Sequence, residues 1–523
     1  IIRTSCSDPG GTEWGDAVKD GTQDDRTVAL EGERTIVYTK AGDATLYTSE
    51  DGGKTLVALR KVNVADMLDL KRISISLSGS TADLTKDDVK ITDSDGKEIA
   101  ISSVSYNIAN LASELDITKK YTVTVYDLPP VTVLPLTYMA SRSFEEKYAY
   151  DGELGVALAA ESTTFRLWAP TASKVTLNLY NNGTGADGKA SHELTKGEKG
   201  VWSLTLNQNL NGKYYTYTVS TMLGANEVVD PYARSAGLNG QRGMILDLDA
   251  TDPDGWVNTP YDNPAVENYT DAQIWEVHVR DFSNNITSSE YKGKYLAFTE
   301  TGLTNSAGIP VGVDYLKQLG ITHVHLLPSF DYASVDESKT DGFNWGYDPQ
   351  NYNVPEGSYS TDPTDGAVRV NEYKQMVQAL HNQGISVVMD VVYNHTYAGE
   401  SNFHFIVPYY YYRYNTTTGV NSNGSGCGNE TASERAMMRK FMIDSVTYWQ
   451  KEYNVDGFRF DLMGLHDIKT MQELEKAVHA YNPEALIYGE GWTGGGTTLS
   501  ENSSSILKNL TTLNKGTSSE GVN

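Results

Sequence analysis

The chain of 523 residues carries a formal net charge of -26, and its length predicts about three or four domains. That charge repels phosphate-rich partners, which excludes nucleic acid and anionic membrane surfaces but leaves a neutral ligand such as a sugar unaffected. No apolar run of about 18 residues is present in the sequence, so no membrane span is expected in this stretch.

The 34 tyrosines favour a carbohydrate ligand, because an aromatic face stacks on a sugar ring while the hydroxyl stays available for hydrogen bonding. The alternative is that these tyrosines pack within sheets, as most of them will. The two cysteines, Cys6 and Cys427, are too few for a disulfide framework. The sequence begins at Ile1 without a recognisable signal peptide, which we interpret as a trimmed start.

The first 138 residues have the patterns of accessory β modules. Residues 1–66 are rich in Gly, Asp, Thr and Glu, with short candidate strands between turns, which predicts a β module and a candidate carbohydrate-binding remnant. Its aromatic residues Trp14, Tyr38 and Tyr47 do not mark a sugar platform. Residues 67–138 alternate apolar and polar positions in ISISLSG and YTVTVYD, which predicts an immunoglobulin-like β domain that acts as a spacer.

A further β-rich segment covers residues 148–250. Its candidate strands alternate in TTFRLWAP and SKVTLNLY and continue through VWSLTL and GKYYTYTV, which predicts a β-sandwich. Trp168 offers an aromatic face to a sugar, but we expect it to lie in the core of the sandwich.

Strand-like apolar runs alternate with amphipathic helices in the rest of the chain. Such an alternation is typical of a parallel β/α barrel. The candidate strands begin at Ala272, Ile321, Ile385, Gly457 and Ala485. Because a complete barrel needs eight strands, we interpret residues 272–523 as the N-terminal part of a (β/α)8 barrel, truncated after the fifth strand. The predicted fold is multidomain, with β-sandwich accessory modules followed by an incomplete TIM barrel.

Two acids end the last two candidate strands, Asp461 after GFRF and Glu490 after LIYG. The helix between them makes these strands parallel neighbours, so both carboxylates lie at the barrel end where chemistry occurs. Arg459 shares a strand face with Asp461 and is expected to keep it ionised. Glycines and the aromatics Tyr488 and Trp492 around Glu490 favour its protonated form. Such a pair fits glycoside hydrolysis, whereas the alternative is two ordinary strand-end or helix-cap acids.

Four motifs carry a resemblance to a known family. DVVYNH (390–395), GFRFDLMG (457–464) and YGEGW (488–492) resemble, in order and spacing, the first three signature regions of the alpha-amylase superfamily, glycoside hydrolase family 13. FNWGYDP (343–349) resembles the marker of its type I pullulanases, in which the first position is more often Tyr.

The resemblance implies roles for whole segments and for the two acids. Residues 148–250 look like the starch-binding-type sandwich of debranching enzymes, and the insertion at 396–435 looks like the protruding subdomain of pullulanases. Asp461 would be the nucleophile and Glu490 the acid and base of a retaining reaction.

The resemblance also implies a set of substrate-binding residues. Tyr347 is expected to stack under the sugar at the cleavage point, with Asp348 shaping that pocket. His395 is expected to hydrogen-bond to the primary hydroxyl of the same sugar. Arg459 and Trp492 complete the set.

The sequence assigns no metal site. His395 and His404 lack a flanking carboxylate pattern such as HExxH, so no metal ligands are predicted. The superfamily commonly binds calcium, but no ligands can be assigned here, and the predicted reaction requires no cofactor. Cys427 is expected to be a buried thiol without a catalytic base.

These expectations describe a secreted or cell-surface bacterial hydrolase that acts on α-glucan polysaccharides and oligosaccharides at α-1,6 branch linkages. The alternatives are an amylopullulanase or amylase-like α-1,4 hydrolase and, in a different class, a non-catalytic glycan-binding protein. No HD or HDN element for the family's third carboxylate follows Trp492. The stretch alone is therefore expected to be inactive.

Overall fold

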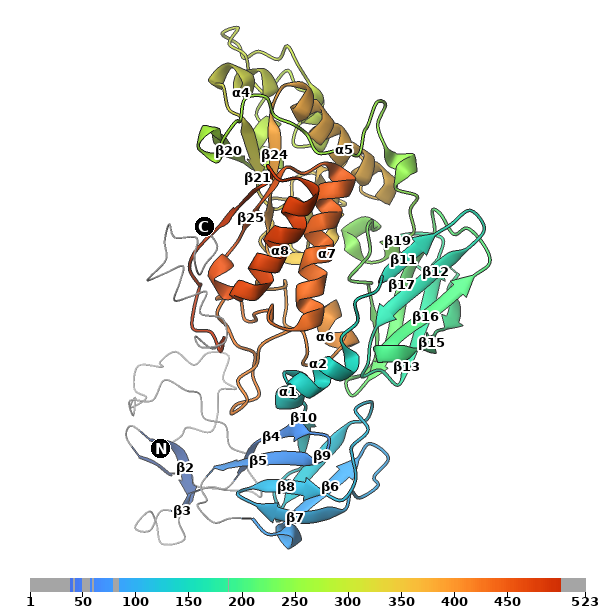
Figure 1. The fold of residues 1–523 in the computed structure, drawn as a ribbon, viewed down its shortest axis with the longest axis vertical. Helices are drawn as coiled ribbons and strands as arrows, with labels where there is room; N and C mark the ends of the chain where they lie inside the picture. Colours follow the sequence, from blue (N-terminus) through green and yellow to red (C-terminus); the bar gives the residue numbers. More distant parts are fainter. Residues whose placement is uncertain are drawn as a thin grey trace, which may run out of the picture. The chain divides into compact units, whose positions relative to one another are not determined.

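The computed structural model describes two compact units, residues 1–138 with 416–419 and residues 139–415 with 420–523 (Figure 1). The residues described are 38–40, 43–48 and 57–58 for the backbone, and 61–78, 84–186 and 188–499 in full. Most of the β module predicted at 1–66, including Cys6 and Trp14, lies outside the described residues, as does the chain after residue 499.

The first unit is built from β-strands. A small antiparallel sheet contains β1 (Tyr38–Lys40), β2 (Asp43–Thr48) and β3 (Val57–Ala58). A larger sheet has the order β6–β9–β10–β4–β5–β8–β7, in which β10 pairs antiparallel with β9 and parallel with β4. Its strands are β4 (Lys61–Asp69), β5 (Arg72–Ser78), β6 (Val89–Asp93), β7 (Ile101–Ser105), β8 (Ile108–Leu111), β9 (Tyr121–Val125) and β10 (Val131–Leu134), followed by the short helix α1 (Leu136–Met139).

Strand β4 corrects the predicted boundary between the first two modules. The expected domain began at residue 67, whereas β4 begins at Lys61 and pairs with β5 along its length. Val62 and Val64 already face the core, each no more than 8% exposed. The residues KVNV at 61–64 have the polar–apolar alternation of a strand, but the predicted boundary assigned them to the preceding module.

The second unit begins with helix α2 (Arg142–Tyr148) and a β-sandwich. Its two sheets have the orders β11–β12–β16–β15 and β14–β13–β17–β18, with β19 paired to β17. Trp168 on β12 is 2% exposed and donates its indole N–H to the carbonyl oxygen of Tyr148 at 2.9 Å, which confirms the predicted core position. The strands are β11 (Gly155–Leu158), β12 (Thr163–Trp168), β13 (Lys174–Tyr180), β14 (Ala190–Glu193), β15 (Thr195–Lys196), β16 (Val201–Leu206), β17 (Tyr214–Thr221), β18 (Gly224–Val228) and β19 (Gly243–Met244).

The rest of the second unit contains a parallel sheet in the order β20–β21–β24–β25–β26. All four neighbouring pairs are parallel, which confirms the predicted alternation of strands and helices. The strands are β20 (Ile274–Val277), β21 (His323–Leu326), β24 (Ser386–Val391), β25 (Gly457–Phe460) and β26 (Leu486–Gly489). Every residue of the central strand β24 is buried, as expected for a strand covered on both faces.

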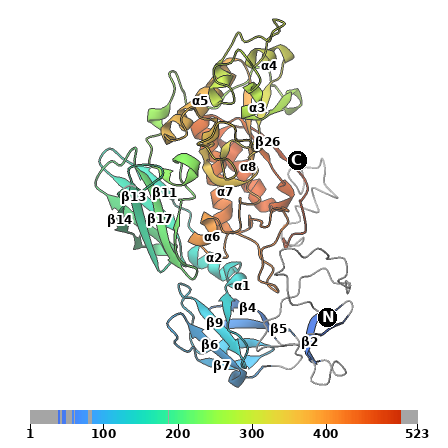
Figure 2. The same cartoon turned by 180° about the vertical axis from the view of Figure 1, so that it is seen from behind.

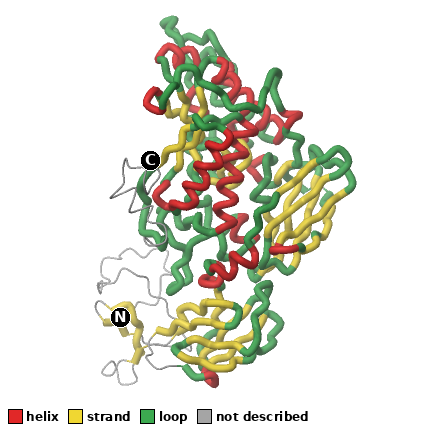
Figure 3. The backbone as a smooth tube through the Cα atoms, in the orientation of Figure 1, coloured by secondary structure: helices red, strands yellow, loops and turns green. Residues whose placement is uncertain are grey.

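Helices flank these strands (Figure 3). Helix α7 (Ala436–Tyr453) buries Phe441 and Trp449 on the apolar face that its periodicity predicts, and it packs beside α8 (Ile468–Tyr481) in both views (Figures 1 and 2). Gly320 ends α4 at φ 73°, a left-handed conformation that glycine adopts without strain. The other helices are α3 (Val279–Ser283), α4 (Val313–Leu319), α5 (Gly366–Asn382) and α6 (Asn402–Ile406), and β22 (Phe330–Tyr332) pairs with β23 (Pro349–Pro355).

The first barrel strand is shorter than its apolar run. The sequence predicts a strand from Ala272 to Ser283, whereas β20 ends at Val277 and α3 begins at Val279. His278 caps that helix, since its Nδ1 accepts a hydrogen bond from the backbone N–H of Asp281. Across the part of the chain that the structure describes, each helix is too short or too polar to cross a bilayer.

Candidate active site

Asp461 and Glu490 occupy equivalent positions at the ends of neighbouring strands. Strands β25 and β26 are parallel, with Phe460 opposite Gly489, so each acid stands one residue beyond its strand. The backbone N–H of Glu490 continues the ladder by donating to the carbonyl oxygen of Phe460 at 3.0 Å. This register confirms the predicted juxtaposition of the two acids at the carboxyl end of the sheet.

A single guanidinium connects the two carboxylates. Nη1 of Arg459 lies 3.2 Å from Oδ1 of Asp461, and Nη2 lies 2.5 Å from Oε1 of Glu490. Nη1 also lies 2.9 Å from Oδ1 of Asp390, a fully buried carboxylate on β24. Arg459 therefore fixes both acids and is itself held by a third.

Burial and Arg459 act on the ionisation of Asp461 in opposite directions. Burial raises the pKa of Asp461 to about 6 and the negative charge of Asp390 adds to this, while the hydrogen bond from Asn394 and the charge of Arg459 oppose it. Asn394 donates to Oδ2 of Asp461 at 2.8 Å. Loss of water around the carboxylate outweighs the guanidinium, so the pKa of Asp461 is raised although Arg459 favours the ionised form, as predicted.

The raised pKa of Asp461 predicts an acid limb in the pH profile. Below pH 6 the carboxyl gains a proton and cannot attack a sugar, so kcat/KM on an α-glucan is expected to fall about tenfold for each unit below that value. Initial rates in buffers of constant ionic strength measure this limb. An acid limb centred below about pH 4, the ordinary range of an aspartate, would contradict the assignment.

The structure also corrects the expected setting of Glu490. The sequence predicts an apolar environment, but this side chain contacts Arg459 and accepts the backbone N–H of Leu462 at 3.1 Å. Tyr488 packs its ring edge-to-face with His325 instead of against Glu490, and Trp492 is 55% exposed. Arg459 reaches both acids because all three side chains gather at the same end of the two strands.

Asp390 is the centre of a buried hydrogen-bond network. It accepts the hydroxyl of Tyr347 at 2.8 Å and contacts Nε2 of His325 at 3.1 Å. His325, which lies on β21, was not among the predicted site residues. The sequence did contain a signal for His325. The strand THVHLL is next to β24, and its alternating positions place every second side chain on the same face.

His395 uses both ring nitrogens within the protein. Nδ1 lies 2.7 Å from Oδ1 of Asn394, and Nε2 lies 2.9 Å from the carbonyl oxygen of Tyr347. Burial lowers the pKa of His395. Both partners are acceptors, so the neutral ring donates to only one of them. The contact of His395 with a sugar hydroxyl stays a prediction.

The remaining predicted substrate residues lie around this network. Tyr347 reaches Asp390 through its hydroxyl, and Asp348 is the next residue, with its pKa raised by burial. Trp345 and Trp492 are 62% and 55% exposed, so their faces are open to a ligand. Stacking of Tyr347 and Trp492 on a sugar stays a prediction.

The insertion at 396–435 contains a buried anchor that the sequence analysis missed. Arg413 is 3% exposed and donates to the carbonyl oxygen of Leu465 at 2.9 Å, while its guanidinium pairs with Glu430 and Glu434. The insertion thereby holds the turn that follows Asp461. Cys427 in this insertion is exposed, which corrects the predicted buried thiol: it stands in a turn between two glycines of positive φ.

One group of three carboxylates was tested as a calcium site. Among the described residues, oxygens of Asp331, Glu337 and Glu356 lie within 4.8 Å of one another. Arg369 already supplies the cation, with Nη2 2.9 Å from Oε2 of Glu337. Glu337 also accepts backbone N–H groups from Asn239 and Gly357, so its oxygens are not free to bind a metal and the group does not fit calcium.

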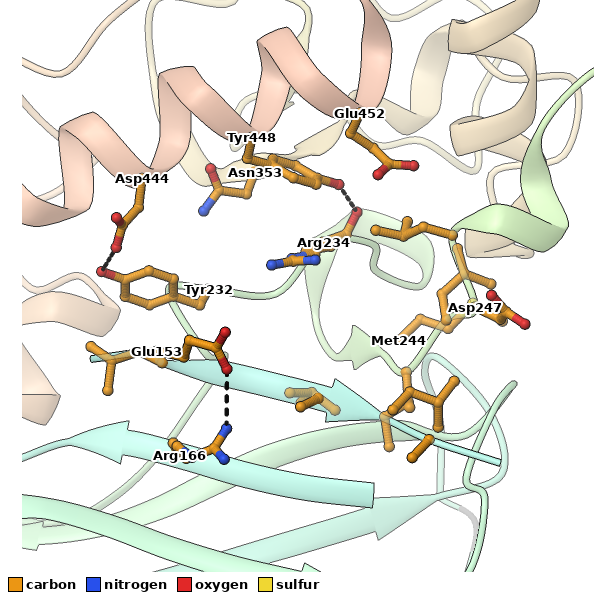
Figure 4. Close-up of a pocket in the computed structure, with 18 of the residues that line it drawn as sticks. Glu153, Arg166, Tyr232, Arg234, Met244, Asp247, Asn353, Asp444, Tyr448 and Glu452 are labelled. Carbon is orange, nitrogen blue, oxygen red and sulfur yellow. Dashed lines mark hydrogen bonds and ion pairs between the residues drawn. The ribbon is translucent and has the colours of Figure 1, made fainter. Parts of the chain in front are cut away.

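A cavity of about 1030 Å³ lies between the sandwich and helix α7. Figure 4 shows Tyr232 directed at Asp444, to which its hydroxyl donates at 3.0 Å, and Glu153 paired with Arg166 at 3.8 Å. Asp461 and Glu490 do not line this cavity. The chemistry of the paired acids, not cavity size, therefore locates the candidate active site.

Two family models match the chain at places that agree with the fold. Carbohydrate-binding module 48 (isoamylase N-terminal domain) matches residues 153–233, which contain most of the sandwich. The alpha amylase catalytic domain matches residues 283–408, which include β21 and β24. Fold and site together define a multidomain protein of the alpha-amylase class, with a module 48 sandwich before its catalytic domain.

The similar proteins are pullulanases. The chain is 42% identical to pullulanase of Bacillus subtilis over 67% of this chain and 48% of that protein, and 37% identical to chloroplastic pullulanase 1 of Arabidopsis thaliana over 67% and 41%. The pullulanase structure from Bacillus acidopullulyticus matches with a TM-score of 0.77 and 35% identity, covering 85% of this chain and 68% of that one. The structure of pullulanase from Paenibacillus barengoltzii matches with a TM-score of 0.67 and 47% identity, covering 70% of this chain and 57% of that one.

The chain therefore belongs to the pullulanase family of the alpha-amylase superfamily. It spans less than half the length of the two curated relatives named above.

Proposed function

We propose that the protein is a retaining glycoside hydrolase that cleaves α-1,6 branch linkages in pullulan and starch-derived glucans. The observation that carries this proposal is the pair of acids, Asp461 and Glu490, fixed by the one guanidinium of Arg459 at the ends of adjacent parallel strands. A protein that only binds glycans has no need for two such acids in one position.

The two acids divide the reaction into two steps. An oxygen of Asp461 attacks the anomeric carbon as the glycosidic bond breaks, and Glu490 gives its proton to the departing oxygen. Glu490 then takes a proton from water, whose oxygen attacks the same carbon and releases Asp461 from the glycosyl ester. Two inversions at that carbon retain its configuration. The nucleophile and the acid are both side chains, so the proposed reaction requires no cofactor.

The family supports α-glucans as substrates. Similar pullulanase structures carry maltohexaose and α-cyclodextrin in one case and maltotriose in another. The FNWGYDP loop, which resembles the marker of type I pullulanases, supports α-1,6 specificity, and so does the module 48 sandwich, which is named for the isoamylase N-terminal domain. A secreted or cell-surface location is proposed from the family resemblance alone.

The products of pullulan digestion test the bond specificity. We expect maltotriose to be the end product, since α-1,6 cleavage releases the repeating unit, and we expect slow attack on linear amylose. Panose from pullulan would instead indicate α-1,4 cleavage and the amylase-like alternative. Rapid hydrolysis of both substrates would indicate an amylopullulanase. Tight binding of pullulan in a calorimeter without release of reducing ends would indicate a glycan-binding protein.

A further inference from the structure

The turn after Asp461 holds a residue in a conformation that its side chain disfavours. Leu462 has φ 42° and ψ 47°, in the left-handed region. Among the described non-glycine residues with positive φ, Leu462 is the only aliphatic one, and the others are Tyr, Asn or Lys. A side chain of this kind occupies the region only where surrounding contacts impose it, and such strain concentrates at functional sites.

The strained residue directs its backbone at Glu490. The N–H of Leu462 donates to Oε2 of Glu490 at 3.1 Å, and the N–H of Gly464 donates to the backbone carbonyl of Glu490 at 3.1 Å. The turn therefore holds both the main chain and the carboxyl group of this acid. Oε1, the other carboxyl oxygen, faces Arg459.

Contacts on three sides impose the conformation of the turn. A Cβ atom on Gly464 would lie 2.6 Å from the carbonyl oxygen of Trp492, so only glycine allows this approach. Arg413 donates to the carbonyl oxygen of Leu465, and the N–H of Leu465 donates to the carbonyl oxygen of Leu462 at 2.9 Å. The insertion, the turn and the segment after β26 are thereby joined.

We infer that Leu462 is a positioning residue: its left-handed backbone aims the N–H that orients the carboxyl group of Glu490 for proton transfer to the glycosidic oxygen and from the attacking water. This inference rests on the proposed function, in which Glu490 is the acid and base. A purely structural turn would affect stability, whereas a positioning turn affects the step that needs the proton.

The sharpest test removes only the N–H. Incorporating leucic acid at position 462 replaces the amide by an ester and leaves the side chain in place. We expect kcat on pullulan to fall about 10- to 100-fold, part of what a general acid contributes, with KM changed less than about threefold. The kcat/KM for α-maltotriosyl fluoride, which reports the first step and whose leaving group needs no proton, should fall less than about threefold. The same ester at Leu223, whose N–H donates to the hydroxyl of Thr221 in the turn between β17 and β18, is the matched control.

Two side-chain variants test the conformation independently. Leu462→Ile adds a β-branch that disfavours the left-handed region, and Leu462→Asn is compatible with it. We expect the Ile variant to lose activity on pullulan but not on the fluoride. The Asn variant should keep most of the parent's activity on pullulan. Tyr106→Val is the control at another left-handed position, since Tyr106 has φ 51° and is 85% exposed, and it should leave both activities unchanged.

Equal losses on pullulan and on the fluoride, or no loss on either, would overturn the inference. If the unmodified protein cleaves linear α-1,4 glucans instead of pullulan, the proposed bond specificity fails, and the same comparison is made with maltoheptaose. If it cleaves nothing, as the sequence predicts for this stretch alone, a crystal structure of the ester form decides the inference. A Glu490 carboxyl group that keeps its position without the N–H refutes the positioning role.

Discussion

Replacing Asp461 by Asn is expected to lower pullulan hydrolysis by about 10⁴-fold or more, because the amide does not form the glycosyl ester. The substitution keeps the size of the side chain, so folding should be retained. Release of reducing ends measures the rate, and circular dichroism verifies the fold. A variant that keeps more than about 1% of the parent rate would exclude Asp461 as the nucleophile.

Two further variants test whether the loss of activity is specific to Asp461. Asp444→Asn removes a carboxylate on α7 that pairs with Lys440 at 2.7 Å, away from the paired acids, and is expected to change the rate by less than about twofold. Asp461→Ala with added azide is expected to produce a β-glycosyl azide, because the anion attacks from the side that the carboxylate occupied. Absence of that product under conditions in which an activated glycosyl fluoride is bound would contradict the assignment.

Replacing Arg369 by Met is expected to destabilise the second unit by about 3 to 5 kcal/mol, because it leaves buried carboxylates without their counter-ion. Arg369 is fully buried, 2.9 Å from Glu337 and 3.6 Å from Asp331. It also donates to the carbonyl oxygens of Pro355 and Pro363. Urea denaturation followed by tryptophan fluorescence measures the change.

The control is Arg142→Met, which removes an exposed arginine that pairs with Glu146 across one helical turn. We expect no measurable change in the denaturation midpoint, since exposed ion pairs contribute little. An Arg369→Met protein as stable as the parent would show that protonation of the acids compensates for the lost guanidinium.

The stability that Glu356 contributes is expected to fall as pH rises from 5 to 8. Burial, followed by the charge of Glu337, raises the pKa of Glu356 from 4.5 to about 8. A carboxyl group with a raised folded pKa binds its proton more tightly in the folded state. The stability it contributes is present below pH 4.5 and is lost as pH rises towards 8. Because Glu356 stays protonated in the folded state up to about pH 8, this loss should appear in parent and variant alike, and urea denaturation at pH 5 and pH 8 measures it.

The succession of strands and helices could be predicted because it depends on local periodicity. Alternation identified the strands of both β-rich segments, and helical spacing identified α7 with its buried Phe441 and Trp449. Topology then followed, since a strand, a helix and a strand of this length give parallel neighbours. The position of Asp461 beside Glu490 is a direct consequence of that rule and of their place at the strand ends.

Local sequence pattern did not predict the structure correctly at two places. The apolar run after Ala272 predicts one long strand, but His278 caps a helix within it. The exposed position of Cys427 likewise depends on a glycine turn, not on the type of residue.

The sequence by itself determined the fold class, the order of the domains and the two acids, because each is encoded by residues near one another in the chain or by a short motif. The tertiary structure decided the environment of those acids. Arg459 reaches Glu490, burial raises the pKa of Asp461, and Leu462 directs its N–H at the acid 28 residues later. Electric fields and hydrogen bonds depend on distance in space and on the exclusion of water, and neither quantity exists until the strands have closed side by side.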